Sequence, residues 1–233
     1  MFIIYDLIFI VFAIAYLPIY IFRRKFHRGF WMRFGFLPGK IIEKLKDKKV
    51  IWLHAVSVGE AKVAKILYEY LKRDYSAYRI AISTVTSTGN SIVEKFIKKE
   101  DIAFYFPLDL SFIVKRIIRL INPVLFISFE TEIWPNLVCQ LHRKNVAQIL
   151  VNGRISDRSF GGYRMIRCLL KRILSKIDLF CMQTPIDSER ITFLGAPLER
   201  VKVTGNMKFD GIDYSPACPE KFGEFPGLSP WNF

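Results

Sequence analysis

The sequence predicts an α/β fold: a Rossmann-like parallel sheet with helices on both faces, preceded by an N-terminal membrane-anchor helix. Three observations predict the sheet. From Val50 onward, short apolar runs typical of buried strands alternate with helical patterns. The connections are short, and several helix starts carry a capping residue or a proline in the first turn. A repeated strand–helix unit favours parallel pairing with helices covering both faces.

Residues 1–22 form an almost unbroken apolar stretch, interrupted by one acid, Asp6, and one proline. About twenty apolar residues suffice to span a bilayer, so we expect a membrane anchor here. Basic residues 23–25 follow at once and place the rest of the chain in the cytoplasm, whereas a cleavable signal peptide carries its basic residues before the apolar run. Because Asp6 is costly near the bilayer centre, a tilted or interfacial anchor is an alternative, as is a buried core helix.

The chain of 233 residues carries a formal net charge of +14, and we expect residues 23–49 to form a basic linker. Basic segments near a membrane are attracted to anionic lipid. They also attract nucleic acid, but the aromatic residues do not interleave with the basic ones as a stacking platform requires. Four cysteines without C-x-x-C spacing and three scattered histidines indicate reduced thiols of a cytosolic domain and no metal site.

The α/β domain is expected over residues 50–210. Its strands are expected at residues 50–56, 79–85, 103–106, 124–129, 147–151, 179–182 and 201–204. Its helices are expected at about residues 61–73, 88–99, 111–120, 135–143, 161–176 and 186–193. Residues 211–233 form a Pro-rich tail without strand–helix periodicity, which is typical of a linker or of the broken start of another unit.

The first expected strand leads into Ser57, Gly59 and Glu60 at the start of a helix. Ligands of parallel α/β sheets bind at the carboxyl ends of the strands, and a helix start favours an ionised carboxylate. Glu60 is therefore a candidate general base. The plain alternative is an acidic residue in a first helical turn.

Other strand ends carry further charges. Glu130 and Glu132 directly follow the fourth strand, where ionised carboxylates avoid burial without partners. Lys208 follows the last strand. With Glu60, this set suits proton abstraction from a hydroxyl coupled to departure of a phosphate leaving group. The sequence has no D-x-D, P-loop or G-x-G-x-x-G motif, which favours metal-free sugar or phosphoryl chemistry.

Hydroxyl and guanidinium groups lie at the same predicted edge. The turn after the second strand offers hydroxyls and amides to a phosphate or sugar, or caps a helix. The segment after the fifth strand carries arginines and serines suited to an anionic ligand. The residues expected to contact a ligand at this edge are Ser57, Thr86, Ser87, Glu132, Arg154, Ser156 and Arg158.

Five ordered motifs carry a resemblance to a known family. They are His54–Glu60, Thr86–Gly89, Glu130–Asn136, Asn152–Ser156 and Gly205–Asp210. On these motifs the chain resembles, over roughly residues 1–210, the N-terminal half of the bacterial 3-deoxy-D-manno-octulosonic acid (Kdo) transferases that act on lipid A precursor.

The resemblance implies the N-terminal, acceptor-binding domain of a glycosyltransferase-B architecture, in which the seven ligand-contacting residues named above would bind the acceptor. The implied reaction transfers Kdo from CMP-Kdo to lipid IVA in lipopolysaccharide biosynthesis, without a cofactor. In that family the residue matching Glu60 is the proton acceptor, and those matching Glu130 and Lys208 stabilise the transition state. The implied location is the cytoplasmic face of the inner membrane. The expected partners are the lipid A precursor and the anionic membrane surface, and nucleic acid is not expected to bind.

The family's second domain, which carries the CMP-binding residues, would follow Asp210, where this sequence has the Pro-rich tail. We therefore expect CMP-Kdo binding only together with a C-terminal domain not present here, and the chain is expected to be a fragment, an interrupted frame or a half-enzyme. One alternative is a non-catalytic, membrane-tethered lipid A-binding half-domain. Another is a basic membrane- or nucleic-acid-binding protein, which leaves the three carboxylates unexplained.

Overall fold

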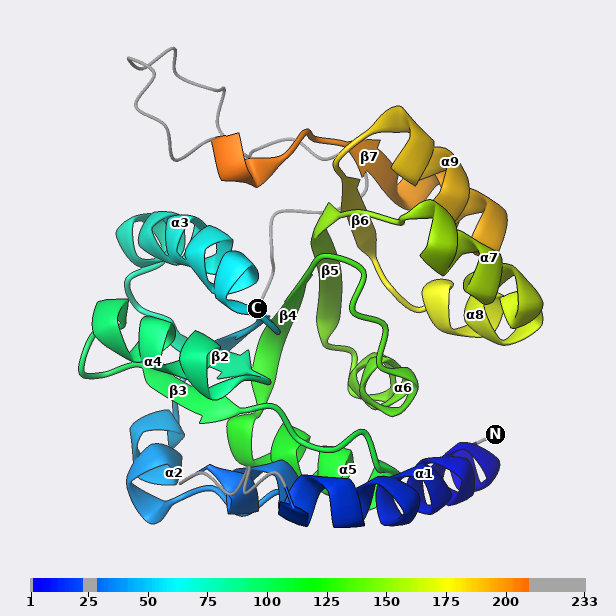
Figure 1. The fold of residues 1–233 in the computed structure, drawn as a ribbon. Coiled ribbons are helices and arrows are strands. Elements are labelled where there is room, and N and C mark those ends of the chain that lie inside the picture. The colour runs from blue at the N-terminus through cyan, green and yellow to red at the C-terminus, as the bar shows by residue number, and fades with distance from the viewer. Residues whose placement is uncertain (1, 23–28, 210–233) are drawn as a thin grey trace.

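The protein contains a seven-stranded parallel sheet with the strand order β3-β2-β1-β4-β5-β6-β7 (Figure 1). A computed structural model describes residues 2–22 and 29–209. The strands are β1 (Val50–His54), β2 (Arg79–Thr84), β3 (Ile102–Tyr105), β4 (Pro123–Phe129), β5 (Ala147–Gly153), β6 (Leu179–Met182) and β7 (Val201–Val203). The chain winds outward from β1 to β3 and then returns to the other side of β1, so the direction of winding reverses between β1 and β4. The parallel α/β sheet predicted from the sequence is confirmed.

The helices alternate with the strands. The α-helices are α1 (Phe2–Phe22), α2 (Gly39–Leu45), α3 (Val58–Asp74), α4 (Ser87–Phe96), α5 (Ser111–Ile121), α6 (Pro135–Arg143), α7 (Asp157–Met165), α8 (Arg167–Leu174) and α9 (Pro185–Leu194). Short 3-10 helices are η1 (Phe30–Phe34), η2 (Leu198–Arg200) and η3 (Met207–Phe209).

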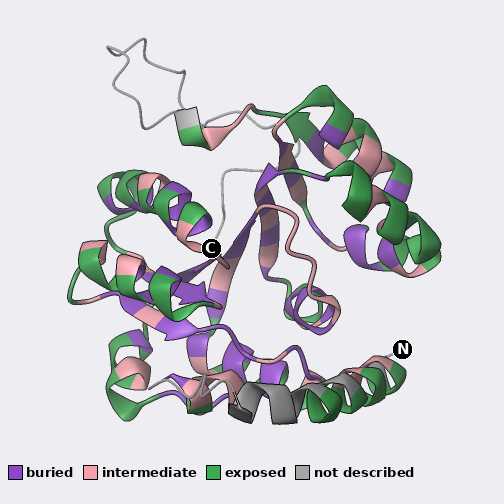
Figure 2. Cartoon of the chain, in the orientation of Figure 1, coloured by how far each residue is buried: buried purple, intermediate pink, exposed green. Residues whose placement is uncertain are grey.

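Helices cover both faces of the sheet, as the sequence predicts. Along β1, Ile51 and Leu53 pack in the core under α3 and α4. The intervening Trp52 packs in the core under α5 and α6. Figure 2 shows the buried residues gathered along the strands and on the inward sides of these helices. Because neither face of β1 meets solvent, the strand reads in sequence as a continuous apolar run.

Residues 29–49 differ from the expected basic linker, because they contain η1 and α2. Leu37 and Leu45 of this segment are buried in the same core as the α5 residues. Residues 29–39 are mostly apolar and the lysines gather in residues 40–49, so the basic charge belongs to only part of the segment.

The helix expected at residues 161–176 begins earlier and is two helices, α7 and α8, which meet at Ile166. The Ser156 hydroxyl accepts a hydrogen bond from the Ser159 amide and so starts α7 four residues before Gly161. No residue of α7 is buried, whereas α8 buries three. α7 and α8 therefore pack differently against the domain, whereas the sequence pattern predicted one helix.

The first helix lies beside α5 (Figure 1), and the Asp6 side chain contacts the domain through hydrogen bonds from Ser111 and Asn136. Ile3, Val11 and other apolar side chains of α1 are exposed. Among the residues described, no helix combines the length and the hydropathy needed to cross a membrane. The membrane anchor therefore stays a prediction, and residues 23–28 and 210–233, which include the basic run and the tail, lie outside the described residues.

Candidate active site

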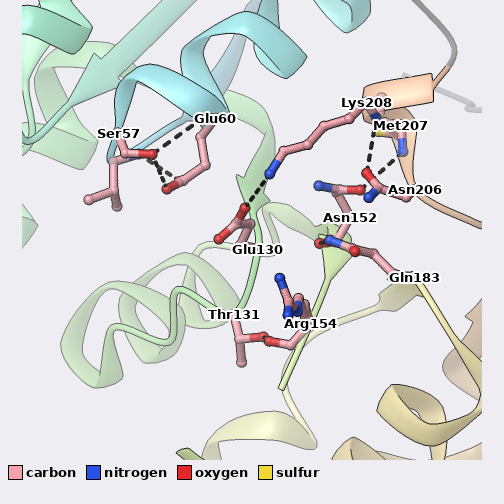
Figure 3. Close-up of polar contacts among 11 residues, drawn as sticks. Ser57, Glu60, Glu130, Thr131, Asn152, Arg154, Gln183, Asn206, Met207 and Lys208 are labelled. Carbon is pink, nitrogen blue, oxygen red and sulfur yellow. Dashed lines mark hydrogen bonds and ion pairs between the residues drawn. The ribbon is translucent and has the colours of Figure 1, made fainter. Parts of the chain in front are cut away.

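The polar residues singled out in the sequence meet at the carboxyl edge of the sheet, where the winding reverses between β1 and β4. In open α/β sheets this position forms the ligand-binding crevice. Figure 3 shows Ser57 and Glu60 at the start of α3, Glu130 after β4, and Lys208 reaching the same place from η3. Segments about 150 residues apart along the chain thus meet at one edge.

Glu60 is 5% exposed and its carboxylate is held in place at the start of α3. One oxygen accepts a hydrogen bond from the Val56 amide at 2.8 Å, and the other from the Ser57 hydroxyl at 2.9 Å. The Ser57 hydroxyl also accepts from the Glu60 amide at 3.4 Å, which makes the pair a capping box. The plain alternative, a first-turn residue that stabilises the helix, therefore holds for Glu60, and its role as a base stays a prediction.

Burial raises the pKa of Glu60, and the negative charge of Glu130 raises it further, while the hydrogen bonds from Val56 and Ser57 oppose this. A carboxylate with a raised pKa holds a proton more readily at neutral pH. The orientation and the proton affinity of Glu60 both suit a group that receives a proton from a substrate hydroxyl.

Glu130 has a left-handed backbone conformation, with φ of 56°. This conformation is rare for residues other than glycine, asparagine and aspartate, and strain of this kind costs about 1–3 kcal/mol. Its amide donates to the Val151 carbonyl at 2.9 Å, which ties it to β5. Its carboxylate lies 3.5 Å from the Lys208 ammonium group. The Glu130 carboxylate, on a strained backbone, therefore faces the ammonium group of Lys208 in η3.

Glu132 completes a group of three carboxylates. Burial raises the pKa of Glu132 to about 7, and the charges of Glu60 and Glu130 add to the shift. Carboxylates that share a site raise one another's pKa because two adjacent negative charges repel. The structure thus brings together the three acidic residues that the sequence places after two different strands.

Of the expected acceptor contacts, Glu132 belongs to this group and Ser57 binds Glu60, whereas the others make separate contacts. Thr86 caps α4 by accepting a hydrogen bond from Gly89 at 3.0 Å, so the capping alternative holds for this residue. Ser87 begins α4 and is exposed. Among the described residues, exposed Arg154 and Arg158 form no ion pair with the three carboxylates. Two other expected acceptor residues form hydrogen bonds close to them in the sequence: Ser57 with Glu60, and Ser156 with Ser159 at the start of α7.

Sequence reasoning assigned no role to Asn152, which the structure places in the site. Its side-chain oxygen accepts a hydrogen bond from the Met207 amide at 3.1 Å, and its carbonyl accepts one from Gln183 at 2.9 Å. Like Glu130, it has a positive φ, of 54°. Asparagine adopts this conformation more readily than most residues, so the Asn152–Gly153 pair at a strand end is the signal that could have found it.

Comparison with known proteins identifies the family. A sequence model of the family described as 3-deoxy-D-manno-octulosonic-acid transferase (kdotransferase) matches residues 28–211. A bifunctional glycosyltransferase/methyltransferase from Fusobacterium nucleatum is 44% identical over 169 residues, covering 71% of this chain and 26% of the relative. The 3-deoxy-D-manno-octulosonic acid transferase of Haemophilus influenzae is 39% identical over 160 residues, covering 69% of this chain and 38% of the relative.

Solved structures share the fold at low identity. A UDP-GlcNAc 2-epimerase from Neisseria meningitidis superposes with a TM-score of 0.50 and 12% identity, covering 70% of this chain and 48% of that structure. A Listeria monocytogenes protein described as a UDP-N-acetylglucosamine 2-epimerase gives a TM-score of 0.52 and 15% identity, covering 68% and 45%. The chain spans between about a quarter and a half of the length of these relatives and structures. By its sequence, the chain belongs to the 3-deoxy-D-manno-octulosonic acid (Kdo) transferase family, of which it carries the N-terminal part.

Proposed function

We propose that this chain provides the acceptor-binding half of a glycosyltransferase that moves Kdo from CMP-Kdo to a lipid A precursor, lipid IVA, in lipopolysaccharide biosynthesis. The observation that carries the proposal is the position of Glu60 beside the Glu130–Lys208 pair at the reversal point of the sheet. In the reaction, the acceptor hydroxyl gives its proton to Glu60 and its oxygen attacks the anomeric carbon of Kdo. The bond from that carbon to the phosphate of CMP breaks, and CMP leaves with the electron pair.

The charges at the site support these roles. Val56 and Ser57 fix the Glu60 carboxylate, so the oxygen that receives the proton is already oriented. The carboxylate of Glu130 stabilises positive charge that develops on the sugar as the donor bond breaks. The ammonium of Lys208 stabilises the negative charge that develops on the leaving phosphate. Because the two groups already lie 3.5 Å apart, little reorganisation is needed.

We also propose that the domain lies at the cytoplasmic face of the inner membrane. The exposed apolar side chains of α1, among them Ile3, Leu7 and Ile14, form a surface suited to the boundary between lipid headgroups and acyl chains. The exposed arginines and lysines of α7 and α8 suit anionic lipid. The acceptor is an amphipathic, phosphorylated lipid, so a site beside the membrane surface meets it without extracting it.

The test follows Kdo transfer to lipid IVA in mixed micelles by mass spectrometry. The chain is supplied with CMP-Kdo, either alone or with the C-terminal remainder of the Haemophilus influenzae relative. The expected result is binding of lipid IVA by the chain and transfer when the remainder is present, with transfer lost in Glu60→Gln. Transfer at the wild-type rate in Glu60→Gln would contradict the role of the base. Binding without transfer under both conditions would favour the alternative of a non-catalytic lipid A-binding half-domain.

A further inference from the structure

The side chain of Asn152 is 1% exposed and has one polar atom with no assigned contact. Its oxygen accepts a hydrogen bond from the Met207 amide at 3.1 Å, so its nitrogen must be the atom on the other side. That nitrogen, Nδ2, is buried and has no hydrogen-bond partner among the described residues. Leaving a buried donor unpaired costs about 1–3 kcal/mol.

The backbone at this position is also fixed. Asn152 has φ of 54°, and the next residue, Gly153, leaves no room for a side chain because an added Cβ would lie 2.5 Å from the Met182 sulfur. The Asn152 carbonyl accepts a hydrogen bond from Gln183 Nε2 at 2.9 Å. The main chain and the amide oxygen are thus both fixed, and the direction of Nδ2 is fixed with them.

Figure 3 shows where that direction leads. The Asn152 side chain lies between Gln183 and Lys208, with its nitrogen on the side of the Glu130–Lys208 pair. Glu130 directly follows β4, and Asn152 lies near the end of the neighbouring strand β5. Both residues have a positive φ. This conformation is unfavourable for Glu130, and unfavourable backbone conformations gather at functional sites.

We propose that Asn152 contacts the substrate and that its Nδ2 donates a hydrogen bond to an anionic oxygen bound beside Lys208. This inference rests on the proposed function. An ammonium group and a neutral amide donor on the same side of the site supply charge and direction, which together suit a carboxylate or phosphate oxygen. Both substrates carry such oxygens: Kdo is a sugar acid with a carboxylate, and the lipid acceptor carries phosphates.

The test observes the Asn152 side-chain amide directly by NMR in the full chain labelled with ¹⁵N. Its two amide signals are assigned by their disappearance in Asn152→Asp. The chain is titrated with free Kdo and, separately, with inorganic phosphate. We expect the Asn152 amide signals to shift on titration, and the affinity for the probe to fall at least tenfold in Asn152→Asp. Aspartate tolerates a positive φ and keeps the oxygen that Met207 needs. It also adds a negative charge beside the anionic probe, so a second, neutral variant separates loss of the donor from charge repulsion.

Two further variants keep the test independent of folding. Asn122→Asp is the matched control, because Asn122 also has a positive φ (45°) but is exposed at the C-terminal end of α5, away from the site. Its affinity for the probes should equal that of the wild type. Asn152→Gly adopts a positive φ without strain and also lacks the donor, so it should lose affinity like Asn152→Asp while remaining folded.

The two probes distinguish the source of the oxygen. A shift with Kdo alone assigns the sugar carboxylate, and a shift with phosphate alone assigns a phosphate. A shift with both supports a general anionic oxygen. If Kdo or phosphate shifts the Glu130 or Lys208 signals and leaves the Asn152 amide unchanged, the inference is overturned while the proposed function stands. If neither probe shifts the Asn152 amide at any concentration, the inference is also overturned, and the transfer assay alone decides the function.

Discussion

The carboxylate of Asp6 accepts a hydrogen bond of 3.1 Å from the backbone amide of Ser111, a residue 105 positions further along the chain. The Ser111 hydroxyl donates to the other oxygen of the same carboxylate. α5 begins at Ser111, and the residue before it is Leu110, whose side chain has no hydrogen-bond acceptor. The first helix of the chain therefore supplies the cap that α5 does not supply for itself.

The neighbouring helix is capped in the same indirect way. α6 begins after Trp134, which makes no side-chain cap, and Asp109 accepts hydrogen bonds from the Asn136 and Leu137 amides at 3.0 and 2.9 Å. The Asn136 side chain donates to Asp6 at 2.7 Å and joins the two caps. Because α6 directly follows the Glu130–Trp134 segment, α1 is connected to the site through these bonds.

We predict that Asp6→Ala lowers the free energy of unfolding by about 1–2 kcal/mol, the range for loss of a helix cap. Asp6→Asn should lose less than half as much, since its amide can accept from the Ser111 amide and donate to the Ser111 hydroxyl. Urea denaturation of the chain in detergent measures both. Leu7→Ala is the control, because Leu7 is adjacent and 62% exposed. Equal losses for Asp6→Ala and Leu7→Ala would mean that the cap does not stabilise the protein.

We predict that Glu60→Gln lowers kcat for Kdo transfer by at least a hundredfold, in line with the loss of a general base, and shifts Tm only slightly. Glutamine keeps the volume of the side chain; its oxygen can accept from the Val56 amide and its nitrogen can donate to the Ser57 hydroxyl. Kinetics in the complemented assay and thermal unfolding measure the two effects. Glu69→Gln, on the exposed side of the same helix, should leave both unchanged. A Tm loss large enough to explain the loss of rate would assign Glu60 to the cap alone.

We predict that Lys208→Ala depresses kcat more than it weakens binding of lipid IVA. The ammonium group faces Glu130 at 3.5 Å and is proposed to act on charge that develops during the reaction, and interactions made only in the transition state change kcat. Separate measurement of turnover and of acceptor affinity tests the split. Lys202→Ala, which removes an exposed lysine of β7, serves as the control. Unchanged turnover in Lys208→Ala would remove this residue from the transition state.

We predict that Glu132 makes stability fall as the pH rises. Its folded-state pKa is about 7, above the 4.5 of an unperturbed glutamate. The folded protein therefore holds a proton that the unfolded chain releases, so this contribution to stability is complete below pH 4.5 and is lost as the pH rises through about 7. Glu132→Gln removes this dependence. The free energy of unfolding of the variant minus that of the wild type should therefore be larger at pH 8 than at pH 5.

Urea denaturation of both proteins at the two pH values measures the difference. The comparison is made between proteins at each pH because His54 acts in the opposite direction. Burial lowers the pKa of His54 to about 3, so the wild type and the variant both lose stability as the pH falls below 6.5. The same stability difference at pH 5 and pH 8 would contradict a raised pKa for Glu132.

The sequence predicts the sheet and the acidic centre because both depend on local pattern. Strands covered on both faces read as apolar runs, and the rule that parallel strands present ligands at their carboxyl ends places Glu60, Glu130 and Lys208 at one edge. These signals lie within a few residues of the feature they predict.

Features that depend on distant partners or on backbone conformation do not appear in the pattern. Asp6 reads as a charge in an apolar stretch, since its partners lie more than 100 residues away. Leu110 and Trp134 offer no side-chain cap, and the sequence does not show that Asp6 and Asp109 supply one. The role of Asn152 depends on its positive φ and on the side of the amide that faces Met207, neither of which a one-dimensional pattern specifies.

The contact between α1 and the two helix starts has a practical consequence for producing this protein. The apolar first helix is the part that a biochemist would remove to obtain a sample that needs no detergent. A version that begins after residue 22 would lack the carboxylate that serves Ser111 and Asn136. The shortened protein would be easier to handle, but the segment leading from Glu130 to α6 would lose one of its supports. Affinities for the lipid acceptor measured on it would then describe a loosened site and would be too weak.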